Sequence, residues 1–275
     1  MLKFLSTFIV SVAVYGAELT EFRMITSYGT KSSAYRAKGS GAREVTVFSG
    51  DDVLPQMANG DGWRTQIFLV NLATVRLPFI VDFWKGDGSP WQVAIGGVGT
   101  GDQITGSLAP GATAVFETTG QGSLVQGWAE LTYDFKIGKI GGFGVFRQSV
   151  AGRPDFEAVV PLSSLFDKVI VLPYDNTAGF STGVACVNGG PSSPATITAT
   201  FRDETGTTYA TETIQLPQSG HTAFAMAARF PTTQGRRGTV LFRSSTDFLS
   251  VMGLRFNPGG SFTSFTGLNT VELNP

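Results

Sequence analysis

The stretch LPYDNTAGFSTGVACVN at residues 172–188 nearly repeats an earlier stretch, LPQMANGDGWRTQIFLVN, at residues 54–71. The two stretches match at a constant offset: Gly62 corresponds to Gly179 and Asn71 to Asn188, since 179 − 62 = 188 − 71 = 117. Self-similarity at a fixed spacing is the signature of a repeated structural unit. The sequence therefore predicts that one fold occurs twice.

Outward from these stretches the chain alternates short, β-rich segments with turns rich in Gly, Pro and Asp, which is the pattern of antiparallel strands. The expected strands are 65–71, 78–84, 91–95, 112–116, 127–133 and 141–147, then 182–188, 195–201, 208–216, 238–242 and 248–256. Residues 96–106 are expected to be loop, and only 223–229 approaches a helical pattern, as a single turn. We predict an all-β protein of two tandem antiparallel β-sandwiches, Ig-like or jelly-roll-like, derived from an internal duplication.

The expected organisation is a signal peptide at 1–17, an arm or linker at 18–50, and β-sandwiches at 51–162 and 163–275. Lys3 precedes a short apolar run at 5–14, and the small residues Gly16 and Ala17 follow as a cleavage site. The apolar run is too short to span a bilayer. We expect an exported protein, periplasmic, at the cell surface or secreted, with no membrane span in the mature chain.

Composition limits the partners and the chemistry. The net charge is −1 and only 15% of residues are charged, so nucleic acid is not an expected partner. The single cysteine, Cys186, lies in an apolar run and is expected to be a buried thiol. An exported chain with only one cysteine favours a bacterial source. The single histidine, His221, lacks the partners of a Ser-His-Asp triad or a zinc site, so we expect a structural role and no catalytic residue.

Calcium is the one metal for which the sequence offers ligands, and we expect no other cofactor. Asp61 and Asp175 fall in corresponding loops of the two copies, and loop carboxylates suit Ca²⁺. Asp, Asn and Gly are also the ordinary residues of tight turns, and we favour that interpretation.

The tryptophans suggest a ligand site. Trp84 and Trp91 flank one turn of the first copy and are, among the tryptophans, the best candidates for exposure, where indole rings could stack on sugars; the alternative is packing in the core. Trp63 corresponds to Phe180 in the second copy and is expected in the core.

Several strings resemble a family of uncharacterised exported bacterial proteins with tandem β-sandwich modules. The matching residues are 172–188, 202–206 (RDETG), 216–224 (LPQSGHTAF) and 253–264 (GLRFNPGGSFTS), with looser matches at 54–63 and 141–148. The resemblance implies the fold and the export, and it implies no activity.

We therefore expect an exported, non-enzymatic protein that acts in recognition, adhesion or structure outside the cell. The alternative is a carbohydrate-binding module that uses Trp84 and Trp91, and an enzyme of unrecognised type is third. The expected partner is an extracellular protein or glycan. Self-assembly by strand addition, with the 18–50 arm completing the sheet of a neighbour, is a further expectation.

Overall fold

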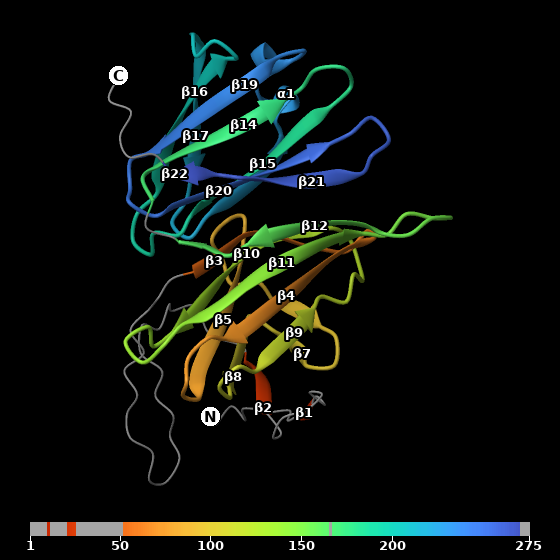
Figure 1. Cartoon of the computed structure of the whole chain (residues 1–275), viewed down its shortest axis with the longest axis vertical. Coiled ribbons are helices and arrows are strands. Elements are labelled where there is room, and N and C mark those ends of the chain that lie inside the picture. The colour runs from red at the N-terminus through yellow and green to blue at the C-terminus, as the bar shows by residue number, and fades with distance from the viewer. Residues whose placement is uncertain (1–9, 12–20, 26–51, 165–166, 270–275) are drawn as a thin grey trace, which may run out of the picture.

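The computed structural model describes residues 10–11, 21–25, 52–164 and 167–269. These residues form antiparallel sheets almost throughout, arranged as two pairs that follow one another along the long axis of the molecule (Figure 1). We call the sheets built from residues 52–164 the first sheet pair and those from 167–269 the second sheet pair. Each pair encloses its own apolar core. The all-β, sandwich-type fold expected from the sequence is confirmed.

The first sheet pair consists of a large sheet in the order β1-β2-β8-β5-β10-β3-β13 and a four-stranded sheet in the order β12-β11-β4-β9. A small hairpin, β6-β7, stands beside them. The strands are β1 (Val10–Ser11), β2 (Glu21–Ile25), β3 (Asp52–Asn59), β4 (Trp63–Asn71), β5 (Leu77–Lys85), β6 (Val93–Ile95), β7 (Gly99–Gly101), β8 (Gln103–Leu108), β9 (Thr113–Glu117), β10 (Val125–Tyr133), β11 (Ile140–Gln148), β12 (Phe156–Pro161) and β13 (Ser163–Ser164).

The second sheet pair consists of a five-stranded sheet in the order β17-β16-β19-β14-β22 and a four-stranded sheet in the order β18-β15-β20-β21. Its elements are β14 (Val169–Asp175), β15 (Ser181–Asn188), β16 (Ala195–Asp203), β17 (Thr208–Leu216), β18 (His221–Ala225), the short helix α1 (Met226–Arg229), the 3₁₀ turn η1 (Pro231–Thr233), β19 (Arg237–Ser244), β20 (Leu249–Phe256), β21 (Phe262–Thr266) and β22 (Leu268–Asn269).

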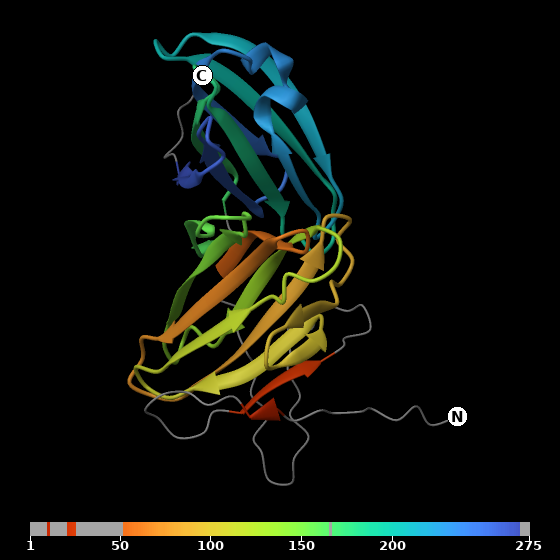
Figure 2. The same ribbon diagram turned by 90° about the vertical axis from the view of Figure 1, so that its right-hand side faces the viewer.

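Strand order recurs between the two sheet pairs. The run β8-β5-β10-β3 has the same order as β17-β16-β19-β14, and β12-β11-β4-β9 has the same order as β21-β20-β15-β18. Figure 2 shows the two pairs from the side. A duplication would require this correspondence, and it supports the duplication inferred from the sequence, which stays a prediction.

The repeated string has a local physical reason. The hydroxyl of Thr65 accepts from the Ala58 N–H at 2.9 Å and donates to the Ala58 carbonyl at 3.0 Å. Thr182 makes the same two bonds with the backbone of Asp175, at 2.9 and 3.1 Å. Each threonine thus closes the connection between two strands, and the buried backbone groups on both sides are satisfied. The turn between them needs a left-handed glycine, Gly179 in the second sheet pair, at φ 80°.

Several sequence expectations need correction. The expected loop at 96–106 is wrong, because it contains β7 and the start of β8. The first sheet pair extends past the expected boundary at 162, since β13 pairs with β3. The signal peptide expected at 1–17 lies outside the described residues except for 10–11, which pair with β2. In the arm, only 21–25 is described, and this strand pairs with β8 of its own chain. The single helical turn expected within 223–229 is confirmed as α1.

Candidate functional site

The two sheet pairs meet in a close-packed junction. The turn before β18 lies against the first sheet pair, where the indole Nε1 of Trp128 donates to the Ser219 carbonyl at 2.9 Å. Gly88 is required here: it has φ 80°, and a Cβ on it would lie 2.1 Å from the Gln218 carbonyl oxygen. Polar bonds and close backbone contact therefore hold the two pairs against each other along one side of the junction.

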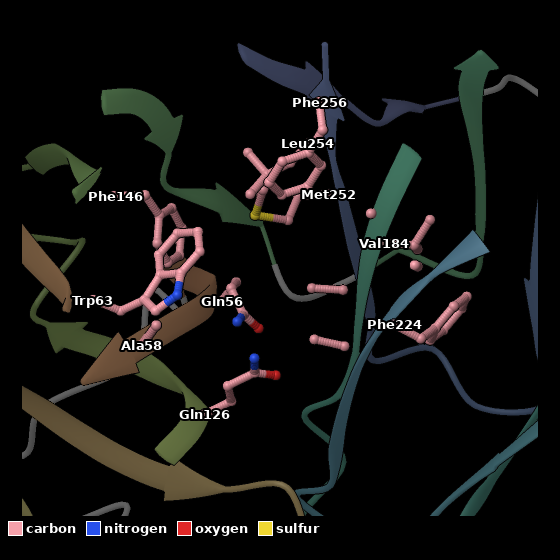
Figure 3. Close-up of a pocket in the computed structure, with 14 residues that line it drawn as sticks. Gln56, Ala58, Trp63, Gln126, Phe146, Val184, Phe224, Met252, Leu254 and Phe256 are labelled. Carbon is pink, nitrogen blue, oxygen red and sulfur yellow. The ribbon is translucent and has the colours of Figure 1, made fainter. Parts of the chain in front are cut away.

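Beside these contacts the junction opens into a cleft of about 330 Å³, near the lower end of the usual range for ligand pockets. In Figure 3 the side-chain amides of Gln56 and Gln126 point into this space, with Trp63 beside them. We call it the junction cleft. It is lined by Gln56, Ala58, Trp63, Gln126 and Phe146 from the first sheet pair and by 183–185, 223–225, Met252, Leu254 and Phe256 from the second.

Small side chains explain why this space is not filled. Successive residues of a strand point to opposite faces of the sheet. On β15 the larger Val184 packs into the core of the second sheet pair, which leaves Gly183 and Ala185 for the face toward the first sheet pair. On β18, Ala223 and Ala225 fall on that same face. Four residues with no side chain beyond Cβ thus meet the first sheet pair, and a void remains.

One polar contact crosses the back of the cleft. The Nε2 of His221, on β18, lies 2.5 Å from the Oε1 of Gln56, on β3, and both side chains are buried. Burial lowers the pKa of His221 from its ordinary value of 6.5 to about 4. The ring is therefore neutral at neutral pH, and the tautomer that suits an amide oxygen carries its proton on Nε2. His221 thus fixes Gln56 without bringing a charge to the cleft.

Backbone groups also border the cleft, because β18 is the edge strand of its sheet. The Asn188 N–H donates to the Gly220 carbonyl at 2.8 Å, whereas the His221 N–H turns outward to the Gly86 carbonyl at 3.0 Å. Hydrogen bonding alternates along an antiparallel strand. The N–H and C=O groups of Ala223 and the N–H of Ala225 therefore also point outward, away from β15, whereas the Ala225 carbonyl begins the helix α1 as its N-cap. Because 223–225 are consecutive and all line the cleft, this edge forms one of its walls.

The chemistry of the lining is that of binding. None of its residues is an Asp, Glu, His, Cys, Lys or Arg, so it offers no group for general acid–base or nucleophilic catalysis. Cys186 is on β15 with its side chain fully buried in the core of the second sheet pair, and burial raises the pKa of its thiol to about 12. This places the thiol where the sequence predicted it, in an apolar core.

The expectation that Trp84 and Trp91 are exposed is wrong. Their exposed fractions are 7% and 3%. Trp84 stacks on Trp128 with ring centroids 6.1 Å apart, and Trp91 packs in the core of the first sheet pair. Position beside a turn suggested exposure, but the second sheet pair covers this turn. Neither indole presents a face on which a sugar could stack.

The two aspartates weighed as calcium ligands each bind groups of the protein. Asp61 accepts from the Leu124 N–H at 2.9 Å, and Asp175 accepts two bonds from Arg255, at 3.0 and 2.7 Å. In the described part of the chain, no three His, Cys, Asp or Glu side chains come close enough to hold a metal ion. The hydrogen bonds of both residues are those of turn and ion-pair contacts within the fold.

Sequence reasoning missed the junction cleft, although one signal of it is present. At the offset of 117, Gln66 corresponds to Gly183 and Phe68 to Ala185. At these two positions the first sheet pair carries larger residues and the second carries the two smallest. That difference marks a face that another part of the molecule approaches closely, but the approaching part could not be read from the pattern.

Comparison with known proteins gives no further guide: no family model, curated protein or solved structure matches the chain. Among the described residues, no helix has the length and apolar character needed to cross a membrane.

Proposed function

We propose that this chain is an exported, non-enzymatic recognition protein whose binding site is the junction cleft. Its ligand is an extended, apolar segment of another protein, which adds as a strand to β18. The export rests on the leader-like start of the sequence and on the resemblance to exported β-sandwich proteins. The observation that carries the proposal is the outward-facing backbone edge of β18 beside an apolar cleft.

A peptide fits these features better than a compact ligand does. A strand added at a sheet edge gains affinity from main-chain hydrogen bonds, and it gains specificity from pockets that accept alternate side chains. Ala223 supplies an outward N–H and C=O and Ala225 supplies an outward N–H. The cleft lies on the face toward which alternate side chains of the added strand would point. Gln126 supplies a polar group to the cleft from the first sheet pair. An adhesive role follows if the segment belongs to another cell-surface protein.

The test uses a phage-displayed random peptide library selected on the immobilised full chain. We expect enriched peptides with large apolar residues at alternate positions. Peptides made from these sequences are then measured by fluorescence anisotropy against the chain and three variants. Ala225→Pro suits the backbone, because Ala225 has φ −74°, close to the angle of proline, and it removes only an outward N–H. Ala225→Ser keeps that N–H, and Ala223→Leu fills the cleft.

The expected result is a loss of affinity of about tenfold or more for both Ala225→Pro and Ala223→Leu, with Ala225→Ser unchanged. Peptides that bind Ala225→Pro and Ala223→Leu as tightly as they bind the unmodified chain would overturn the proposal. A loss of affinity in Ala223→Leu alone would support binding in an apolar pocket but would refute the addition of a strand to β18. Binding on a glycan array, with no peptide enriched, would favour the carbohydrate alternative at a site other than Trp84 and Trp91.

A further inference from the structure

The end of the first sheet pair farthest from the junction carries an unusual set of exposed apolar residues. Strand β4 begins at the junction, where Trp63 stacks on Phe262 with centroids 5.5 Å apart, and it runs away to Asn71. The loop after β4 (72–76) and the loop after β10 (134–139) meet at that distant end, at the bottom of the first sheet pair in Figure 1. We call these two loops the distal tip.

The two loops form one surface. The Leu72 N–H donates to the Lys139 carbonyl at 2.8 Å, and the amide of Asn71 donates to the Val75 carbonyl at 2.8 Å. Gly138 approaches so closely that a Cβ on it would lie 2.3 Å from the Cβ of Ala73. The two loops are thus held against each other, and together they form one tip of the first sheet pair.

Several side chains of the distal tip are large, apolar and exposed. Leu72, Val75, Phe135 and Ile137 are exposed by 63%, 43%, 52% and 53%. In the described part of the chain nine large apolar side chains are exposed, and these two short loops hold four of them. Single exposed apolar residues are ordinary, but a contiguous group marks a surface that contacts something else.

The charges of the distal tip are mostly positive. Arg76, Lys136 and Lys139 are exposed, whereas Asp134, the one acid of the two loops, is buried and binds the Lys136 N–H at 3.0 Å. The loops therefore carry a net charge of +2, three cations minus one anion, on a chain whose net charge is −1. Apolar side chains surrounded by cations are complementary to a bilayer with anionic headgroups.

The second sheet pair provides an internal comparison. Its corresponding loops are GGPSSP at 189–194 and STDF at 245–248, in which Phe248 is half-buried against an apolar cluster that contains Trp84 and Trp128. They are joined in the same way, by the Gly189 N–H and the Phe248 carbonyl at 2.9 Å. None of their exposed residues is large and apolar, and Asp247 adds a negative charge. The fold therefore does not require an apolar, basic tip at this position, and the first sheet pair has one for another reason.

We propose that the distal tip inserts its four apolar side chains into the interface of an anionic lipid bilayer, while the cations beside them bind the headgroups. The contact is peripheral and involves no membrane span. It places the junction cleft at the opposite end of the first sheet pair, facing away from the lipid.

The test is co-sedimentation of the full chain with phosphatidylcholine vesicles made with and without phosphatidylglycerol. One variant removes the apolar contact (Leu72→Ser/Phe135→Ser/Ile137→Ser), and a second reverses two charges (Lys136→Glu/Lys139→Glu). The matched control, Val115→Ser/Val159→Ser, removes side chains that are 47% and 51% exposed elsewhere on the first sheet pair. The apolar start of the sequence is common to all variants, so its own affinity for lipid cancels in the comparison.

We expect binding to vesicles with phosphatidylglycerol to fall by about tenfold or more in both tip variants and to stay unchanged in the control. A second readout is independent of the start of the chain. In Phe135→Trp, the new indole should be quenched by phosphatidylcholine brominated on its acyl chains, and in Val159→Trp it should not.

Equal binding of the tip variants and the unmodified chain would overturn the proposal, and so would an unquenched indole at position 135. Thermal unfolding of each variant confirms that it is folded, since all the substituted side chains are exposed. If the apolar variant instead converts a dimer to a monomer in sedimentation velocity without lipid, the tip is a self-association surface and the lipid proposal is wrong.

Discussion

Thr65 and Thr182 are fully buried and use one hydroxyl for two backbone bonds. Replacing either by valine keeps the shape of the side chain but leaves the backbone N–H of Ala58 or Asp175 without that acceptor. We expect each substitution to lower the free energy of unfolding by about 1–3 kcal/mol, the cost of an unsatisfied buried group. Chemical denaturation of Thr65→Val and Thr182→Val measures both.

The matched control is Thr211→Val, at an exposed position of β17, which should change stability by less than about 0.5 kcal/mol. Similar losses at Thr65 and Thr182 would support the inference that the two connections are copies of one device. A loss of stability in only one of the two variants would show that the repeated threonine does not have the same structural role in both sheet pairs.

At the scale of elements, Gly127 and Gly238 occupy corresponding places on β10 and β19. A Cβ on Gly127 would lie 2.1 Å from the Trp84 carbonyl oxygen, and one on Gly238 would lie 2.0 Å from that of Arg202. Since the obstructing atoms are backbone, alanine at either position must displace a neighbouring strand. We expect Gly127→Ala and Gly238→Ala to cost about 1–3 kcal/mol each.

The control for this pair is Gly96→Ala, because its added Cβ would make only an ordinary contact, 3.6 Å from the Glu117 carbonyl oxygen. Thermal melting compares the three variants. A melting temperature unchanged in Gly238→Ala would mean that β16 and β19 can separate at this point without loss, contrary to their continuous register.

Much of the element order could be predicted, because alternation survives wherever one face of a strand is buried. Strand β16, for example, shows buried residues at nearly every second position, as its ATITATF pattern predicts. Strand β3 could not be predicted in the same way, since seven of its eight residues are buried and no alternation remains. The glycine-rich segment that contains β7 carries turn residues inside a strand, which only its pairing with β6 explains.

The candidate site was less predictable than the fold. Trp84 and Trp91 flank a turn, which suggests exposure, yet the burial of a side chain depends on what packs against that turn. Here the packing residues are 218–219, more than a hundred positions later in the chain. The junction cleft, likewise, is formed by two faces that no local pattern relates. The repeat offset indicates which residues are small, but not what lies opposite them.

For the whole molecule, the junction depends on groups that must stay neutral or well packed. An apolar cluster of Val53, Trp84, Trp128 and Val187 joins the two sheet pairs, and His221 lies near it with its pKa lowered to about 4. Another buried titrating group, Asp175, has its pKa lowered below the ordinary 3.8, because hydrogen bonds from Thr177 and Arg255 outweigh its desolvation. The contribution of Asp175 to the free energy of unfolding is therefore lost only below pH 3.8, whereas His221 acts between pH 6.5 and about 4. The two groups thus affect stability in separate pH ranges.

His221 then gives the molecule a defined response to acid. Between pH 6.5 and about 4 the unfolded chain binds a proton on this ring and the folded chain does not, so the free energy of unfolding falls as pH falls through that range. The difference between the two pKa values corresponds to a loss of about 3 kcal/mol. Denaturation of the unmodified chain and of His221→Gln at pH 7, 5.5 and 4 measures it. The glutamine side chain can still donate to Gln56 but does not titrate. Between pH 7 and pH 4 the free energy of unfolding of His221→Gln should therefore fall by about 3 kcal/mol less than that of the unmodified chain. Parallel curves for the two proteins would mean that the ring at the junction is protonated without cost, and that water reaches it in the folded state.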